Sequence, residues 1–296
     1  MHWLIYACLS RICFAVSNIL DSHFCVGYFK NLICQMFYFG AYQLIFLAIA
    51  FLFFPVPLLS PELMFWALLS GLCLALHGVP YLSALKSADT STVVSLFTLG
   101  RVFAPIMSYL LVKEVLDLNE VIGFGITILG SLWHAYKPES FKVDYKLVLK
   151  MMLAGFMVAS FSVCSKKLFL ELDVYTGVFY IFLFDSLFCI LTIFIPLYTN
   201  DIIETVKRKD IRIPYVANVI IAMIGHVLSF TAISLTKVTH VVLIGQFQAF
   251  FALAISYLFF RSSYFKHNES LKRRDVMQKM GGFVIMAVGA YWALGR

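Results

Sequence analysis

Ten long apolar stretches joined by short connections constrain this chain more than any other feature of its sequence. Crossing the hydrocarbon core of a bilayer takes roughly 20 mostly apolar residues in a helix, and each stretch is about that long. With 61% hydrophobic and only 13% charged residues, the chain is also more apolar than a soluble domain. We therefore expect an all-α integral membrane protein of ten transmembrane helices. The expected helices cover residues 3–20, 33–54, 62–85, 91–112, 118–136, 148–169, 175–198, 214–235, 239–260 and 278–294.

The stretches are continuous and do not alternate apolar with polar residues, as the strands of a transmembrane β-barrel would. The first stretch follows no Lys or Arg, carries Arg11 in its middle and precedes no small-residue cleavage site. We therefore expect it to remain in the protein rather than to act as a removable signal peptide. The connections are too short for an extramembrane catalytic domain, so the function is expected inside the helix bundle.

The sequence predicts no metal, disulfide or nucleotide chemistry. The seven cysteines are scattered, with no C-x-x-C pair and no histidine-rich segment. The phosphate-binding pattern G-x-x-x-x-G-K-[ST] is absent, and we expect no cofactor. The net charge of +7 comes from Lys and Arg in separate loops between the apolar stretches. That distribution is typical of membrane topology, and no nucleic-acid partner is expected.

The two halves of the chain align with each other at a fixed offset. An offset of 148 residues matches the segment from Ala84 to Leu111 with the segment that begins at Ala232. With an 11-residue insertion in the basic loop 261–279, the offset becomes 159 and the last helices align as well. The matches are Val93-Val94 with Val241-Val242, Phe103-Ala104 with Phe251-Ala252, Ser108-Tyr109-Leu110 with Ser256-Tyr257-Leu258, Gly123-Phe124 with Gly282-Phe283, Gly130 with Gly289, and Trp133 with Trp292.

This alignment predicts two five-helix repeats, residues 1–137 and 138–296. Because five is an odd number of spans, the second repeat enters the membrane from the opposite side and the repeats are inverted. Inverted repeats are typical of secondary transporters, in which two related halves surround a site at the membrane midplane. Duplicated helix bundles also form membrane enzymes and scaffolds, which stay open as alternatives at this point.

The motifs of the first half resemble the EamA-type family of the drug/metabolite transporter superfamily. The similarity is densest from Tyr81-Leu82-Ser83-Ala84-Leu85 through Val102-Phe103-Ala104 to Glu114, and again over Val121-Ile122-Gly123 and Ile128-Leu129-Gly130. It extends over nearly the whole chain and implies two inverted five-helix repeats. Because members of that family move many unrelated metabolites, the resemblance implies an architecture rather than a substrate.

The chain departs from the family pattern in both halves. Arg101 stands where the family usually has a proline, and Pro105 follows four residues later. Lys113-Glu114 replaces a Gly-Glu pair, and Arg261-Ser262 stands in the second half where a Glu is expected. These differences leave the implied fold intact but weaken any transfer of substrate identity.

Ionisable residues at membrane depth are the first candidates for a substrate site. Placing such a group in hydrocarbon costs roughly 2.5–3.5 kcal/mol on insertion scales, so these residues face the bundle interior. Arg101 lies on one face of its helix with Ser95 and Thr98, and its planar guanidinium suits a carboxylate or phosphate. Arg11 is mid-span in the first helix. The alternative is structural: either arginine pairs with Asp185, or Arg11 reaches toward an interface.

Further candidates are polar or aromatic residues that share helix faces with one another. His77 and Tyr81 lie on one face of the third helix, and the repeat places His226 and Ser229 at an equivalent depth in the eighth. Gln246 matches Thr98 by the repeat. Hydrogen bonds between helices are the alternative role for such residues. The predicted substrate-binding set is Arg101, Thr98, Ser95, His77, Tyr81, Arg11, Asn18, Tyr38, His226, Ser229 and Gln246, and no residue is predicted to be catalytic.

Asp185, in the seventh expected helix, is the candidate for coupling transport to protons. A single buried carboxylate also pairs readily with a neighbour, and that alternative stays open. In the absence of an ATP-binding loop, a proton gradient or simple exchange is the expected driving force.

Two arguments about orientation conflict. The family resemblance implies that both termini are cytosolic. Most of the 23 Lys and Arg residues, however, lie in loops after odd-numbered helices, which by the positive-inside rule places the termini outside. The expected location is the plasma (inner) membrane.

We interpret the chain as a secondary transporter, not an enzyme, that moves a small polar metabolite by alternating access. Arg101 favours an anionic or zwitterionic substrate. The expected partners are that small molecule and the lipid bilayer, and a homodimer is compatible with this interpretation. One alternative is a membrane-embedded enzyme acting on lipid, which calls for a cluster of His, Asp or Glu at one membrane face. Another is a non-transporting partner protein, in which the polar face of the fourth helix encloses no cavity.

Overall fold

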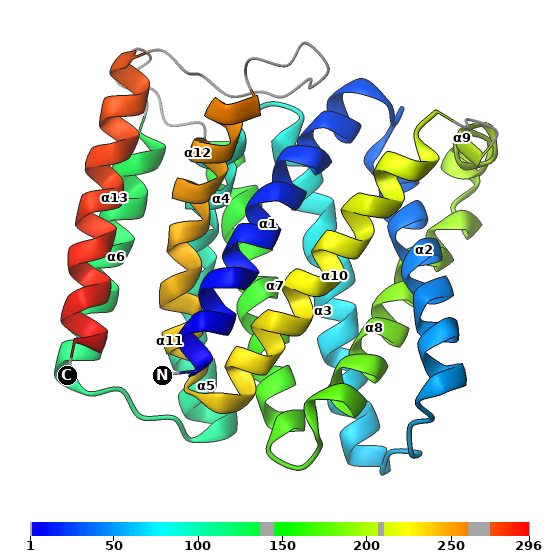
Figure 1. Cartoon of the computed structure of the whole chain (residues 1–296), viewed down its shortest axis with the longest axis horizontal. Helices are drawn as coiled ribbons and strands as arrows, with labels where there is room; N and C mark the ends of the chain where they lie inside the picture. Colours follow the sequence, from blue (N-terminus) through cyan, green and yellow to red (C-terminus); the bar gives the residue numbers. More distant parts are fainter. Residues whose placement is uncertain (1, 137–144, 207–209, 260–272, 296) are drawn as a thin grey trace.

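The computed structural model describes residues 2–136, 145–206, 210–259 and 273–295, and these residues form helices and connections without any strand. The long helices stand side by side, with both termini at the same end (Figure 1). Two features of the sequence lie outside the described part: the expected boundary between the halves at residues 137 and 138, and Arg261-Ser262. The helices are α1 (His2–Gly27), α2 (Leu32–Phe53), α3 (Pro61–Leu85), α4 (Thr90–Arg101), α5 (Phe103–Val112), α6 (Leu118–Ala135), α7 (Tyr145–Phe169), α8 (Val174–Leu191), η1 (Thr192–Phe194), α9 (Pro196–Val206), α10 (Arg212–Leu235), α11 (Val238–Ile244), η2 (Gly245–Phe247), α12 (Gln248–Phe259) and α13 (Arg273–Leu294).

The all-helical prediction is confirmed for the described residues, whereas the ten spans in two inverted repeats stay a prediction. Within the described part of the chain, seven segments are long and apolar enough to cross a bilayer: α1, α2, α3, α7, α8 with η1, α10, and the run from α11 to α12. The bent pair α4 and α5 makes an eighth if it forms one span. By length and composition α6 and α13 are not among them, because charged and polar residues occupy their first turns.

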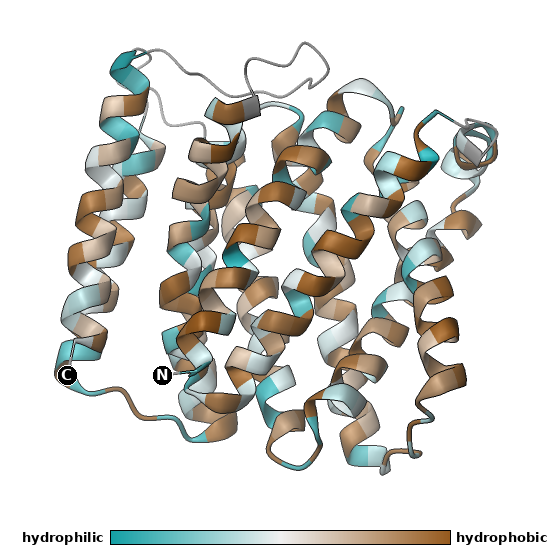
Figure 2. Ribbon diagram, viewed as in Figure 1, coloured by the Kyte–Doolittle hydropathy of each residue, from teal (hydrophilic) through white to brown (hydrophobic). Residues whose placement is uncertain are grey.

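The outer surface of the bundle is apolar and its interior is unusually polar. Large apolar side chains such as Ile49, Leu129 and Val284 are exposed, whereas many Ser, Thr, Asn, Gln and Arg side chains are buried. Figure 2 shows hydrophobic residues along the outside of the helices and hydrophilic ones gathered at several helix ends. A surface of this kind is suited to contact with lipid, which turns the polar side chains toward the interior of the bundle.

Local sequence signals explain where several helices begin. Asn31 and Asp173 accept hydrogen bonds from backbone N–H groups in the first turns of α2 and α8. Ser60 does the same for α3, which starts with Pro61. Asp117 forms a capping box with Glu120 at the start of α6. These caps fix the short connections that hold consecutive helices together.

The predicted single helix over residues 91–112 is wrong, because the chain breaks there into α4 and α5 with a bend of 43°. Pro105 explains the break: it has no N–H to donate to the carbonyl of Arg101, and its ring clashes with that carbonyl. The predicted helix over 239–260 is also interrupted, by the 3₁₀ turn η2. The short helix α9 lies where no separate element is predicted. The two breaks matter because Arg101 and Gly245 lie at them.

The main helix contacts form a reciprocal pattern. Helix α1 packs along α10, and α3 packs along α7. Helices α2 and α8 contact each other, as do α6 and α13, and α4 contacts α12. Helices α1 and α7 run in opposite directions through the bundle, as do α4 and α11 (Figure 1). Every one of these pairs joins a helix of the first half of the chain to one of the second.

Glycines allow the closest of these contacts. A Cβ atom on Gly100 of α4 would overlap backbone atoms of Met152 and Phe156 in α7, and Gly155 meets the backbone of α4 in the same way. A Cβ atom on Gly125 of α6 would meet nothing within 4 Å. The two positions therefore form a matched test of helix packing.

We expect Gly100→Ala to lower the melting temperature of the detergent-purified protein, because backbone atoms of α7 cannot move aside as a flexible side chain can. Overpacking of this kind costs about 1–3 kcal/mol. Thermal unfolding followed by size-exclusion chromatography measures the effect. Gly125→Ala is the control and should leave the melting temperature unchanged. Equal melting temperatures for the two variants would contradict the close α4–α7 contact.

Candidate central binding cavity

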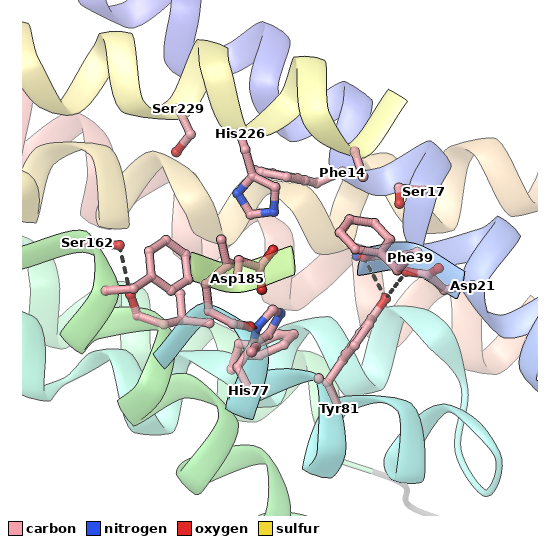
Figure 3. Close-up of a pocket in the computed structure, with 18 of the residues that line it drawn as sticks. Phe14, Ser17, Asp21, Phe39, His77, Tyr81, Ser162, Asp185, His226 and Ser229 are labelled. Carbon is pink, nitrogen blue, oxygen red and sulfur yellow. Dashed lines mark hydrogen bonds between the residues drawn. The ribbon is translucent and has the colours of Figure 1, made fainter. Parts of the chain in front are cut away.

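A cavity of about 140 Å³ lies among the long helices. Its walls come from α1, α2, α3, α4, α7, α8, α10, α11 and α12. A cavity of roughly 150 Å³ is large enough to hold benzene, so this one has room for a small molecule. Figure 3 shows side chains from α3, α8 and α10 pointing into the same space.

Two arginine side chains reach the cavity from different helices. Arg11 and Arg101 are only 6% and 4% exposed, and both line the cavity. Arg11 Nη2 donates a hydrogen bond to Ser229 Oγ at 2.9 Å, whereas Arg101 Nε and Nη1 have no hydrogen-bond partner. A Cβ atom on Gly245 would lie 2.8 Å from Arg101 Nη1 and 3.5 Å from Arg11 Nη1. The two guanidinium groups therefore converge beside the same glycine.

Neither arginine is neutralised by a carboxylate within the part of the chain that the structure describes. The alternative in which Arg11 or Arg101 pairs with Asp185 is not realised there, since no salt bridge joins them. The positive charges face aromatic rings instead: Arg11 Cζ lies 5.4 Å from the centroid of Phe14, and Arg101 Cζ lies 5.2 Å from that of Phe97. A buried charge costs several kcal/mol unless it is compensated. The site thus presents two cations that lack an anion.

A carboxylate network occupies another part of the cavity wall. Asp21 Oδ1 accepts hydrogen bonds from Asn218 Nδ2 at 2.8 Å and Gln35 Nε2 at 3.1 Å. The hydroxyl of Tyr81 lies 2.7 Å from Asn18 Oδ1 and 3.2 Å from Asp21 Oδ2, and Figure 3 shows Tyr81 pointing toward Asp21. Three donors therefore surround Asp21 and compensate its charge.

Asp185 on α8 also lines the cavity but has far fewer partners. Its side chain is buried, and the thiol of Cys189 is a weak donor 3.9 Å from its Oδ1. Among the described residues, no Lys, Arg or His forms an ion pair with Asp185. Its environment therefore differs from that of Asp21, although both carboxyl groups border the same space.

Two histidines and several aromatic rings complete the walls. His77 on α3 is bonded through Nδ1 to the carbonyl of Leu74, and its ring stacks on Tyr81 with centroids 6.1 Å apart. His226 on α10 packs edge-on against Phe14 at 4.7 Å and lies near Phe161 at 6.1 Å. Figure 3 shows the two histidines approaching the cavity from opposite walls. The walls can therefore hold an apolar body next to a polar group.

The structure brings most of the predicted site residues together and places a few elsewhere. Thr98 is hydrogen-bonded to Ser131 and to Gln246, and Tyr38 donates to the carbonyl of Ile202. Ser95 is buried in α4 without lining the cavity. These four join helices or fill the space between them. The predicted residues that do line the cavity are Arg11, Asn18, His77, Tyr81, Arg101, Asp185, His226 and Ser229.

Several wall residues were not predicted, and Asp21 is the most important of them. The expected first helix stopped at residue 20, whereas α1 continues to Gly27 and carries Asp21 inside the bundle. The steps of seven and three residues from Arg11 to Asn18 and Asp21 put all three on one helix face, so the signal was present. The other wall residues outside the predicted substrate-binding set are Phe14, Ser17, Gln35, Phe39, Tyr215 and Gln248.

Comparison with known proteins confirms the predicted resemblance for the second half of the chain. The sequence profile of the EamA-like transporter family matches residues 146–267. No curated protein sequence matches the chain. One crystal structure shares the fold with a TM-score of 0.57 and 16% sequence identity, over 96% of this chain and 97% of its own. Together with the apolar helices, these matches identify a multi-pass integral membrane protein.

Proposed function

We propose that this chain, whose residues 146–267 match the EamA-like transporter family, is a secondary transporter for a small anionic metabolite. The observation that carries the proposal is the pair of buried guanidinium groups, Arg11 and Arg101, that line the cavity without a carboxylate partner in the described chain. A substrate that supplies the missing negative charge compensates both arginines. The same argument excludes a neutral sugar or lipid as the preferred ligand.

The substrate is small. The cavity volume of about 140 Å³ suits a ligand of roughly the size of a substituted six-membered ring. One end of the ligand is a carboxylate or phosphate held by the planar donor groups of the arginines. The rest contacts Phe14, Phe161 and the two histidine rings. A zwitterion satisfies these requirements as well, with its cationic group toward Asp185.

The reciprocal helix contacts support the inverted-repeat architecture of ten spans. If α1 corresponds to α7 and α3 to α10, then the α1–α10 and α3–α7 contacts are equivalent, and both are extensive. Thr98 and Gln246, which are 148 residues apart and equivalent by the alignment, are hydrogen-bonded to each other. The pseudo-twofold axis therefore passes between them. In this proposal α6 and α13 are the fifth and tenth spans.

Alternating access follows from that symmetry. Each half can adopt the arrangement that the other has just left, so the cavity opens first to one side of the membrane and then to the other. The partner-protein alternative required that the polar face of the fourth helix enclose no cavity, and Arg101 on that face lines one. We place the protein in the plasma (inner) membrane.

A thermal-shift screen of the purified protein tests the proposed ligand class. The panel pairs each anion with a neutral compound of the same size, for example glycerate with glycerol and benzoate with benzamide. We expect at least one anion to raise the melting temperature while its neutral partner does not, because a ligand that binds only the folded state stabilises it. Counterflow uptake of that anion into proteoliposomes then measures transport.

Stabilisation by neutral compounds alone would contradict the anion site. Binding of an anion without counterflow would favour a receptor-like partner protein over a transporter.

A further inference from the structure

Two salt bridges connect the halves of the chain, one near each end of the bundle. Lys237 Nζ lies 2.8 Å from Glu120 Oε1, where α6 and α11 begin. Lys279 Nζ lies 3.3 Å from Asp89 Oδ2, where α4 begins. Figure 1 shows that α11 and α4 begin at opposite ends of the molecule. We call these pairs the α11 bridge and the α4 bridge.

The internal repeat relates the two bridges to each other. Asp89 is aligned with Lys237 by the offset of 148 residues, and Glu120 is aligned with Lys279 by the offset of 159. The pseudo-twofold axis therefore turns one bridge into the other, with acid and base exchanged. None of these four residues is among the identical pairs that define the alignment. The alignment and the two observed salt bridges therefore agree independently, and the bridges are equivalent by the repeat.

Each bridge has the same place in its half. Asp89 is the residue before the first turn of α4, and Lys237 is the residue before the first turn of α11. Their partners lie in the outer helices, Glu120 in α6 and Lys279 in α13. Each bridge thus ties the broken helix of one half to the outer helix of the other half.

The bridges are better shielded from water than an ordinary surface pair. The side chains of Lys279 and Asp89 are 5% and 13% exposed, and those of Lys237 and Glu120 are 35% and 8% exposed. The pair Lys30 and Glu204 is 60% and 61% exposed. Exposed pairs contribute little, because water and salt screen them, whereas shielded pairs interact more strongly.

Neighbouring groups reinforce the α11 bridge. Lys237 Nζ also donates to the carbonyl of Val115 at 2.9 Å, and His240 Nε2 is bonded to Glu120. The N–H of Val238 donates to Glu114 at 3.0 Å. Glu114, Glu120 and His240 therefore form a cluster of acidic and histidine side chains around the start of α11. Since Lys237 engages Glu120, the cluster is an interhelical contact.

The bridged helices carry the central site. Arg101 ends α4, and α11 leads directly into Gly245, beside which both guanidinium groups converge. A movement at either bridge therefore moves a wall of the cavity. The bridges themselves do not line the cavity, so they act through the helices that they hold.

We infer that Asp89, Lys279, Glu120 and Lys237 are positioning residues that close the two ends of the bundle in turn. This inference rests on the proposed alternating access. Opening toward the end that carries the termini breaks the α11 bridge while the α4 bridge holds, and opening toward the other end reverses these roles. Both bridges are formed in the structure described.

Native Cys189, which lines the cavity, provides a reporter that needs no substrate. The test uses full-length protein in which the other six cysteines are replaced by alanine, reconstituted in oriented vesicles. The anionic, membrane-impermeant reagent 2-sulfonatoethyl methanethiosulfonate is added from one side at a time. Glu120→Gln should speed labelling at least tenfold from the side of the termini only. Asp89→Asn should do so from the opposite side only.

Two further variants control the experiment. Lys30→Gln removes a partner of the exposed pair and should change labelling from neither side. The double exchange of Asp89→Lys with Lys279→Asp rebuilds the α4 bridge in reverse and should restore the slow rate. Three results would overturn the inference. They are a double exchange that leaves labelling fast, single variants that label equally faster from both sides, and single variants that label no faster than the parent protein. If the single variants show side-specific labelling but the protein transports nothing, the role of the bridges would stand and the proposed transport function would be rejected.

Discussion

Arg101→Gln is expected to reduce counterflow uptake by roughly 30-fold to several-thousand-fold, which corresponds to the 2–5 kcal/mol lost when a buried charge loses its partner. The anionic substrate loses the guanidinium that compensates it, whereas the amide keeps most of the side-chain volume. Initial rates in proteoliposomes at a subsaturating substrate concentration measure the loss. Arg101→Lys should recover part of it, because lysine restores the charge but not the planar donor group.

Stability separates this site role from a structural one. The guanidinium of Arg101 has no carboxylate partner among the described residues, so its removal should leave the melting temperature of the ligand-free protein unchanged or raise it. A structural ion pair would instead show a lower melting temperature. Arg273→Gln, at an exposed position at the start of α13, is the charge-matched control and should affect neither measurement. Full transport by Arg101→Gln would disprove the anion site.

Asp185→Asn is expected to abolish uphill accumulation driven by a pH gradient while preserving counterflow exchange. A carboxyl group that borders the cavity without an ion pair in the described chain can take up and release a proton in each cycle, and an amide cannot. The accumulation ratio in proteoliposomes with an imposed pH gradient should fall to one. Exchange of labelled for unlabelled substrate should continue, since it requires no net proton movement.

Asp21 provides the matched control within the same cavity. Its carboxylate already accepts hydrogen bonds from Asn218, Gln35 and Tyr81. Asp21→Asn should therefore lower the melting temperature, because an amide cannot accept hydrogen bonds from all three donors. The protein that remains folded should still accumulate substrate in response to the pH gradient. The reverse result, with accumulation lost in Asp21→Asn and kept in Asp185→Asn, would move the coupling role to Asp21.

Helical periodicity was sufficient to place much of the site. Arg11, His77, Arg101 and His226 interrupt apolar helices, and the cost of exposing them to lipid turns each toward the interior. Periodicity does not say which neighbour a buried face meets. Thr98 shares a face with Arg101, yet it meets Ser131 and Gln246 instead of the cavity.

Other errors came from helix boundaries and breaks. The predicted first span ended before Asp21, because a carboxylate after an apolar stretch usually indicates a loop. In the structure, hydrogen-bond donors from α2, α3 and α10 compensate the burial of this carboxylate. Pro105 predicts the bend after Arg101, but the apolar pattern continues across it and favoured a single helix over 91–112. The bridges were beyond prediction, because the contact between a helix start and an outer helix depends on how the halves pack.

The exchange of acid and base between the two bridges bears on how such a protein assembles. In the proposed inverted-repeat arrangement, a dimer of two copies of the first half would place Asp89 against Glu120, one carboxylate facing another. A dimer of two second halves would place Lys237 against Lys279, one ammonium facing another. Only the mixed pair brings opposite charges together at both ends. Each half is therefore specific for the other, so halves expressed as separate chains should assemble as heterodimers and leave identical pairs unformed.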